Sequence, residues 1–188
     1  MESNEIVVSI VCEVFNHEQY LERCLQGFVM QKTNFKYEIL IHDDASTDGS
    51  VDIIKKYVSE YPDLFKPIYQ NENQYSKGVG IWRTIQFPRA KGKYIALCEG
   101  DDYWTDPEKL QIQVDYLENH PEAVGCVHKI RVVDEHGNPR KNQRIDWVRQ
   151  RKIFTLEDYQ GIYLPGQIAT FVRRNIFLKP KHDYTIIY

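Results

Sequence analysis

The chain has 188 residues, and 42% of them are hydrophobic, which is enough to build the core of one domain. Acidic and basic residues are mixed along the chain and sum to a net charge of −3, which excludes a general attraction to nucleic acid. No apolar run approaches the roughly 20 residues that span a bilayer, and the N-terminus lacks a signal-peptide pattern. We therefore expect a single globular domain over residues 1–188, located in the cytoplasm.

The four cysteines are scattered and lie mostly inside apolar runs; they are Cys12, Cys24, Cys98 and Cys126. No CxxC pair indicates a zinc site, and the six histidines show no zinc spacing. We interpret the cysteines as buried thiols in a reducing compartment, which agrees with a cytoplasmic location.

Strand and helix patterns alternate in the first half of the chain. Nearly continuous apolar runs predict buried strands at residues 5–14, 37–43 and 93–98, and a shorter strand at 65–70 is weakened by Pro67. A mostly parallel sheet between layers of helices is the arrangement that this alternation predicts.

Helix signals separate these strands. Leu21, Leu25 and Phe28 fall on one helical face after the first strand. The stretch STDGS supplies capping residues for a second helix, and a weaker helical segment precedes the fourth strand. Asp106 followed by Pro107 is a strong start for a further helix.

The second half of the chain is less regular. GCVHKIRVVDEHGNP, at residues 125–139, predicts a strand that leads into a turn. Residues 140–152 are basic, and they form either a solvated loop face or a contact with an anionic membrane or a lipid-diphosphate acceptor. TLEDYQG indicates a helix at 155–161, and IATFVRR indicates a strand at 168–174. The apolar end, HDYTIIY, has the pattern of a strand interior, so we expect the chain to be truncated at its C-terminus.

Acidic side chains cluster in two loops that follow strands. Asp43 and Asp44 end the second strand, while Glu99, Asp101 and Asp102 end the fourth. Parallel sheets bind ligands outside the carboxyl ends of their strands, where these loops and the first loop, FNHE, would meet. Oxygen ligands suit Mg²⁺ or Mn²⁺, which commonly take one or two protein carboxylates together with substrate phosphates. The alternative is a pair of helix caps with solvated neighbours.

Several nucleotide and catalytic motifs are absent from the sequence. GxxxxGK[ST] does not occur, and GVGIWR is neither GxGxxG nor a turn between a strand and a helix. The HExxH and GxSxG motifs are absent as well. The acidic loops therefore carry most of the chemical signal.

At these loops the chain resembles the family 2 glycosyltransferases, inverting enzymes of bacterial type that use nucleotide sugars and have the GT-A fold. The resemblance is carried by three strong blocks and one weaker block; they are VSIVCEVFNHEQYLERCL, YEILIHDDASTDGSVDII, AKGKYIALCEGDDYWTDPEKLQIQVDYL and GQIATFVRR. It implies an α/β GT-A domain with a nucleotide-binding half at 1–133 and an incomplete acceptor-side half at 134–188. Such a domain transfers a sugar with inversion.

The resemblance implies roles for residues of the first two loops. Glu13, Val14 and Phe15 would lie beside the base and ribose of the nucleotide, and Asp44 would accept hydrogen bonds from the pyrimidine, with Asp43 adjacent. The family commonly has a small hydroxyl residue at the position of Glu13 and a tyrosine at that of Phe15. An extra carboxylate near a nucleotide is unfavourable unless it faces away or binds a hydroxyl group.

The resemblance also implies roles for residues that contact the metal and for the polar loop near the donor. Asp102 would be the main metal contact, and Asp101 would bind the ribose or the same Mn²⁺ or Mg²⁺. Lys77 would approach the donor, unless it is a solvated lysine. Tyr103 and Trp104 would either stack on a sugar or pack within the protein.

The family also requires a general base that deprotonates the acceptor hydroxyl. Asp183 is the only acidic residue downstream of the FRR-like strand, and it lacks the expected sequence context, so the base is either Asp183 or absent from this chain. A nucleotide-sugar-binding or assembly domain without turnover is therefore one alternative. A sugar-phosphate nucleotidyltransferase is another, although the Gly-rich basic loop of that class is absent.

The predicted reaction moves a sugar, expected to come from a UDP-sugar, to a hydroxyl of a glycan or lipid-linked acceptor in polysaccharide biosynthesis. Such a reaction is compatible with peripheral contact at the inner face of the membrane and with a homodimer.

Overall fold

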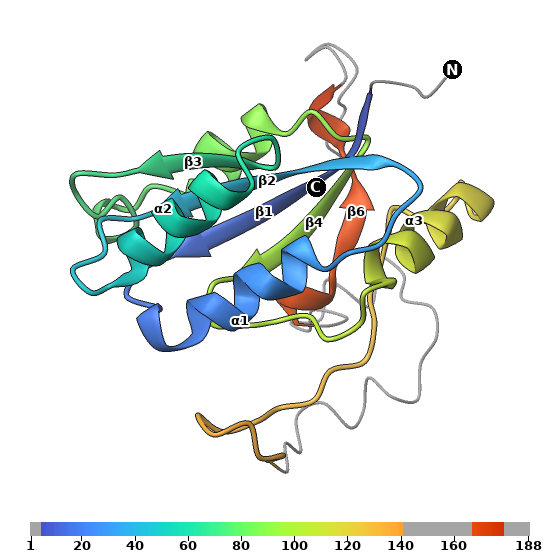
Figure 1. The fold of residues 1–188 in the computed structure, drawn as a ribbon. Coiled ribbons are helices and arrows are strands. Elements are labelled where there is room, and N and C mark those ends of the chain that lie inside the picture. Colours follow the sequence, from blue (N-terminus) through green and yellow to red (C-terminus); the bar gives the residue numbers. More distant parts are fainter. Residues whose placement is uncertain (1–4, 141–166, 179–188) are drawn as a thin grey trace.

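The computed structural model describes residues 5–140 and 167–178 (Figure 1). The helix predicted at 155–161, Asp183 and the basic segment beyond Arg140 lie outside the described residues. The described helices and strands, in chain order, are β1 (Ile6–Val14), α1 (Glu18–Val29), β2 (Lys36–Asp43), α2 (Ser50–Glu60), β3 (Phe65–Tyr69), β4 (Tyr94–Glu99), α3 (Lys109–Asn119), β5 (Gly125–Cys126) and β6 (Val172–Arg174).

The described strands form one sheet in the order β3-β2-β1-β4-β6-β5. The strand β1 pairs in parallel with both β2 and β4, and β2 pairs in parallel with β3. The last two strands reverse direction, since β6 is antiparallel to β4 and β5 is antiparallel to β6. The prediction of an α/β fold with a mostly parallel sheet is confirmed.

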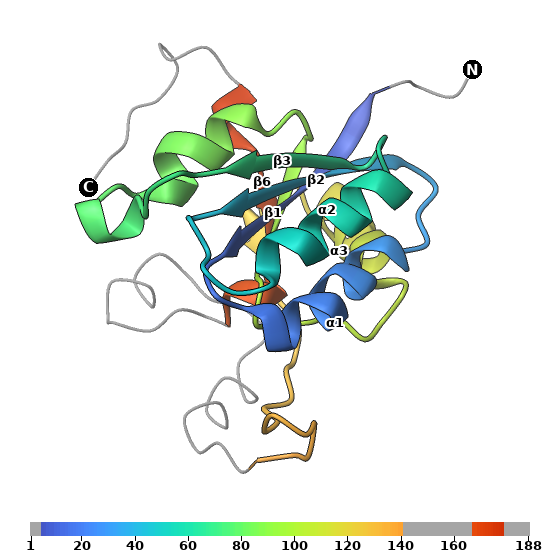
Figure 2. The same ribbon diagram turned by 60° about the vertical axis from the view of Figure 1, so that its left-hand side comes forward.

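The sheet lies between two layers of unequal size. The three α-helices cover one face, and the short helical turns at Trp82–Gln86 and Phe87–Arg89 cover the other (Figures 1 and 2). Alternate residues of β1 enter the two cores: Ile10 packs on the side of the long helices, whereas Val11 packs with Phe87. This two-sided burial explains why β1 is an unbroken apolar run.

The strand β3 forms one edge of the described sheet, and it contains a proline. Pro67 is paired in register with Ile41 of β2. Proline has no backbone N–H to donate, so it is tolerated at an edge, where only one neighbouring strand has to be bonded.

The strand predicted to begin at Gly125 and lead into the turn at 136–138 is wrong over most of its length. Only Gly125–Cys126 is a strand, because the short β6 offers partners to these two residues alone. The predicted turn does form, with Gly137 at a φ of 84°. The strand predicted at 168–174 is shortened in the same way, because Ile168–Thr170 forms a helical turn before β6.

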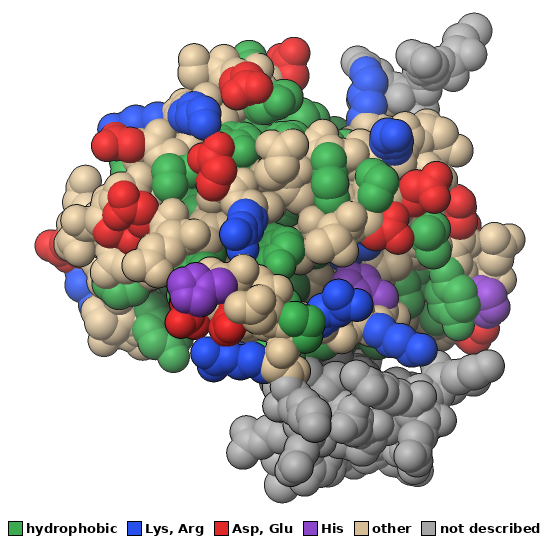
Figure 3. Space-filling view, turned by 60° about the horizontal axis from the view of Figure 1, so that its bottom comes forward, with side chains coloured by type: hydrophobic (Ala, Val, Ile, Leu, Met, Phe, Trp, Pro, Cys, Tyr) green, Lys and Arg blue, Asp and Glu red, His purple; other side chains and the backbone are tan. Residues whose placement is uncertain are grey.

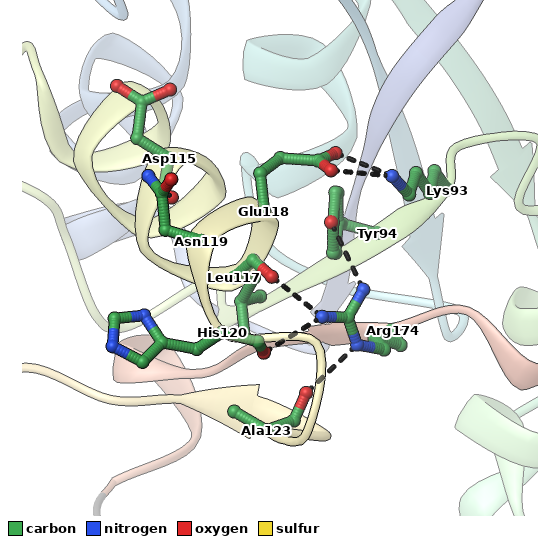
Figure 4. A network of polar contacts seen from close by, with 9 residues as sticks. All are labelled: Lys93, Tyr94, Asp115, Leu117, Glu118, Asn119, His120, Ala123 and Arg174. Carbon is green, nitrogen blue, oxygen red and sulfur yellow. Dashed lines mark hydrogen bonds and ion pairs between the residues drawn. The ribbon is translucent and has the colours of Figure 1, made fainter.

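Arg174 fastens β6 to the end of α3 (Figure 4). Its guanidinium donates hydrogen bonds to the backbone oxygens of Leu117 at 2.6 Å, of His120 at 3.1 Å and of Ala123 at 2.9 Å. A further bond of 3.3 Å reaches the hydroxyl of Tyr94 on β4. One planar side chain thus satisfies carbonyls that the end of the helix leaves free.

Candidate active site at the carboxyl edge of the sheet

The loops that follow β1, β2 and β4 converge at one edge of the sheet. Glu13 is in register with His42 of β2 on one side and with Glu99 of β4 on the other. The backbone amide of Asp44 donates to the oxygen of Val14 at 2.9 Å, and that of Gly100 donates to the oxygen of Glu13 at 2.9 Å. The shared rim expected from the sequence is therefore present.

Three carboxylates gather in the loop after β4. Glu99, Asp101 and Asp102 each offer an oxygen that lies within 4.8 Å of the others. Burial, reinforced by the negative charge of neighbouring acids, raises the pKa values of Glu99 and Asp102 above their usual range. A hard divalent cation would relieve this repulsion, and a set of carboxylate oxygens suits Mg²⁺ or Mn²⁺. The sequence-based assignment named only Asp101 and Asp102, although the position of Glu99 at the end of β4 is a signal for it too.

Gly100 allows this loop to turn sharply against the end of β1. A Cβ atom at this position would lie 2.7 Å from Nδ1 of His17 and 3.0 Å from Cγ2 of Val14. The turn is closed by the amide of Asp102, which donates to the oxygen of Glu99 at 3.1 Å. A larger residue in place of Gly100 would require the side chains of His17 and Val14 to move.

The acids after β2 are buried and differ in their partners. The two carboxylate oxygens of Asp44 accept the backbone amides of Gln74 at 2.7 Å and Tyr75 at 3.0 Å. One oxygen of Asp43 accepts the amide of Ser46 at 3.1 Å, whereas its Oδ1 is buried with no partner among the described residues. Asp44 therefore anchors the loop after β3, and one oxygen of Asp43 is enclosed without a hydrogen-bond partner among the described residues.

Glu13 lies in the centre of this edge and is strongly perturbed. Burial, followed by the charges of Glu99 and Asp44, raises the pKa of Glu13 to about 8. Its Oε1 is buried and lacks a hydrogen-bond partner within the described part of the chain. These surroundings favour the neutral form of the Glu13 carboxyl group, which can donate a hydrogen bond and carries no extra negative charge.

Other predicted nucleotide contacts lie near the same edge. Val14 is fully buried under the loops, whereas Phe15 is 44% exposed beside them. Lys77 is exposed in a helical turn and forms an ion pair with Glu72, which is also exposed. Lys77 thus has an ion-pair partner, Glu72, in its own loop. That Lys77 approaches the sugar donor stays a prediction.

Trp104 packs within the protein and does not form a stacking surface. It is 4% exposed, its ring meets that of Phe28 edge-on at 4.8 Å, and its Nε1 donates to the oxygen of Ala169 at 2.7 Å. Of the two alternatives drawn from the sequence, packing is the correct one. Tyr103 is half-buried, with the guanidinium of Arg23 at 6.0 Å from its ring centre.

A cleft of about 1330 Å³ opens beside the acidic loop. Its walls include the acidic loop, the start of α3, residues 128–135 and the turn before β6. The face turned forward in Figure 3, which is the lower side of Figure 1, carries acidic, basic and histidine side chains close together. The predicted base, Asp183, lies outside the described residues, so the structure assigns it no place.

Residues 9–179 match the family model described as "Glycosyl transferase family 2". The chain belongs to this family. The resemblance inferred from the sequence motifs is therefore confirmed.

Relatives of this family 2 chain occur in several bacteria. An uncharacterised protein of Mycobacterium tuberculosis is 46% identical over 132 residues, which make up 69% of this chain and 37% of that protein. A poly(ribitol-phosphate) beta-glucosyltransferase of Bacillus spizizenii is 30% identical over 155 residues, or 79% of this chain and 24% of the relative. The chain thus spans little more than a third of the first of these relatives and less of the second.

The fold agrees with solved glycosyltransferase structures. TarS residues 1–349 of S. aureus match with a TM-score of 0.67 at 23% identity, covering 90% of this chain and 47% of that 1–349 fragment. The complex of the same protein with UDP matches with a TM-score of 0.58 at 25% identity, covering 72% and 38% respectively. The GT-A fold expected from the sequence is confirmed. Within the described residues, no helix is long and apolar enough to cross a membrane.

Proposed function

We propose that this domain binds a nucleoside-diphosphate sugar, with UDP as the nucleotide, together with Mn²⁺ or Mg²⁺. The protein to which it belongs would transfer the sugar to an acceptor hydroxyl with inversion. The observation that carries this proposal is the convergence of the acidic loop and the buried acids after β2 at one edge of the sheet, beside a large cleft. Membership of family 2 and the UDP complex of TarS support it.

Asp101, Asp102 and Glu99 would hold the cation on the protein side. When bound, the metal supplies positive charge that stabilises the diphosphate as it departs. The three carboxylates would orient that charge towards the cleft. Burial, reinforced by neighbouring acids, raises the pKa values of Glu99 and Asp102, and a bound cation would relieve that repulsion.

The nucleoside would lie across the ends of β1 and β2. Oδ1 of Asp43 is buried at this edge without a partner in the described part of the chain, and it would accept a hydrogen bond from the nucleoside if binding exposes it, while Asp44 keeps the loop after β3 folded over this edge. Glu13, as a neutral acid, can donate to a hydroxyl or a carbonyl of the nucleotide. Phe15 provides an exposed aromatic surface next to them.

The cleft borders the proposed metal site, whereas the residues proposed to contact the nucleoside are not among its lining residues. Its volume of about 1330 Å³ exceeds the roughly 300–1000 Å³ that usually encloses a small molecule, which is enough for an acceptor beside the metal site. We propose a glycan or lipid-linked acceptor, as in the cytoplasmic assembly of polysaccharides. The relative named for poly(ribitol-phosphate) glucosylation supports an acceptor of this kind.

Asp102→Asn tests the metal site, because it keeps the shape of the side chain and removes its charge. We expect UDP binding in the presence of Mn²⁺, measured by calorimetry, to weaken at least tenfold, the scale of one lost charged contact at about 1.5–3 kcal/mol. Asp63→Asn, in the exposed turn between α2 and β3, is the matched control and should bind UDP as the unmodified chain does. Unchanged affinity in Asp102→Asn would contradict the assignment.

A further inference from the structure

A buried lysine lies where the acidic loop meets the second half of the domain. Lys109, the first residue of α3, is 4% exposed and belongs to the wall of the cleft. Its Nζ lies 3.9 Å from the centre of the Trp104 ring and donates a hydrogen bond of 2.8 Å to Oε1 of Gln113. None of the motif-based assignments used this lysine.

The two partners of Lys109 both reach across to the turn before β6. Nε1 of Trp104 donates to the oxygen of Ala169 at 2.7 Å, and Nε2 of Gln113 donates to the oxygen of Thr170 at 2.9 Å. The ammonium group therefore joins two side chains that hold adjacent residues of one turn. That turn is part of the wall of the cleft, as is the acidic loop.

The backbone of Trp104 is fixed from the other side by α1. A Cβ atom at Gly27 would lie 2.9 Å from both the nitrogen and the oxygen of Trp104, so helix and loop are already in contact. Trp104 follows Asp102 by two residues, so only Tyr103 separates it from a proposed metal ligand. In Figure 1 the yellow-green loop after β4 runs close to α1 on its way to α3.

Burying a lysine at this position costs free energy, because its charged group is removed from water. Burial lowers the pKa of Lys109 to about 7, which measures how poorly the surroundings solvate its charge. A methionine or leucine of similar volume would fill the site without that penalty. A cation over the indole face and a directed hydrogen bond to Gln113 are what lysine adds.

We propose that Lys109 is a positioning residue that locks the acidic loop to the turn at Ile168–Thr170 and thereby sets the geometry of the metal-binding carboxylates. This inference rests on the proposed function and adds a residue that the family motifs do not assign. If the proposal holds, a residue of α3, which lies outside the acidic loop, contributes to the affinity for the metal and the nucleotide.

Lys109→Met tests the proposal, because methionine keeps most of the stem and removes both the charge and the donor. In the metal-free protein, hydrogen exchange of the peptides covering 99–108 and 167–171 should become at least threefold faster. With Mn²⁺ present, UDP binding by calorimetry should weaken at least fivefold. Lys109→Arg, which keeps a cation for the indole, should recover part of this affinity, and Lys55→Met on the exposed face of α2 should change neither measurement.

The outcomes separate this proposal from the proposed function. A lower unfolding temperature with unchanged UDP affinity would show a purely structural lysine and overturn the inference, as would unchanged exchange in both peptides. If Lys109→Met does not fold, Trp104→Phe removes the indole donor to Ala169 together with part of the ring that Lys109 contacts, and it should accelerate exchange at 167–171; no acceleration there would overturn the inference. If the unmodified chain does not bind UDP with Mn²⁺, the proposed function fails, whatever the exchange data show.

Discussion

Glu13 shows how one side chain can be tuned by its position in a sheet. It ends up between the neighbouring strands β2 and β4, close to other acids, and burial raises its pKa to about 8 from an ordinary value of 4.5. Folding therefore favours the protonated form. The stabilisation that this proton provides is present in full below pH 4.5 and is lost as the pH rises through about 8.

Glu13→Gln should remove this pH dependence, because the amide resembles the neutral acid and does not ionise. We expect the variant to match the unmodified chain near pH 4.5 and to exceed its unfolding free energy at pH 8.5 by about 1–2 kcal/mol, after discounting for partial exposure. Urea unfolding at the two pH values measures the difference. Glu122→Gln, at an exposed position, should run parallel to the unmodified chain. A Glu13→Gln curve that also runs parallel would contradict the account of Glu13.

At the scale of elements, the close approach of α1 to the acidic loop depends on one glycine. Alanine is normally the better helix former by about 1 kcal/mol, so Gly27→Ala would stabilise an isolated helix. In this protein the new methyl group would lie 2.9 Å from backbone atoms of Trp104, and backbone atoms cannot move aside as a flexible side-chain end can.

We therefore expect Gly27→Ala to destabilise the domain by about 1–3 kcal/mol, the range for overpacking, measured by urea unfolding. Gly80→Ala is the matched control, because a Cβ atom there meets nothing within 4 Å. Equal stability of the two variants would show that the loop can retreat from α1 without loss.

At the scale of the whole molecule, binding of the metal and the nucleotide should raise the free energy of unfolding. A ligand at about 100 times its Kd adds about 2.7 kcal/mol, which for a domain of this size raises the unfolding temperature by roughly 5–10 °C. We expect this rise when UDP and Mn²⁺ are added together, monitored by a thermal shift assay. Adding EDTA should reverse it, and a rise that persists in EDTA would separate nucleotide binding from the metal.

How much of the molecule the sequence predicts depends on the range of the interactions involved. The strands β1, β2 and β4 are predicted correctly because each is an apolar run that is largely buried, so local composition identifies them. The edge strand β3 is shorter and only partly buried, and its sequence signal is correspondingly weaker. Residues 125–133 have a similar local pattern, yet most of them form no strand because β6 provides too few hydrogen-bond partners. Whether two distant segments pair as strands cannot be predicted from the sequence of either segment alone.

The same limit applies to the candidate site. The motifs identify Asp43, Asp44, Asp101 and Asp102 as a group because the ends of parallel strands share one edge. They do not reveal that Asp44 is already bonded to the loop after β3, or that Trp104 is enclosed. These partners lie far away in the sequence and become visible only when the chain is folded.

The proline in β3 has a consequence for the behaviour of this domain in crowded solution. An outermost strand with a complete row of free amide and carbonyl groups invites a second copy to add its own strand, which is how fibrous aggregates grow. Pro67 interrupts that row because its ring nitrogen carries no hydrogen, so a continuous ladder between molecules cannot form there. The residue that weakens β3 thus also makes the β3 edge of the described sheet less suited to the addition of a second strand.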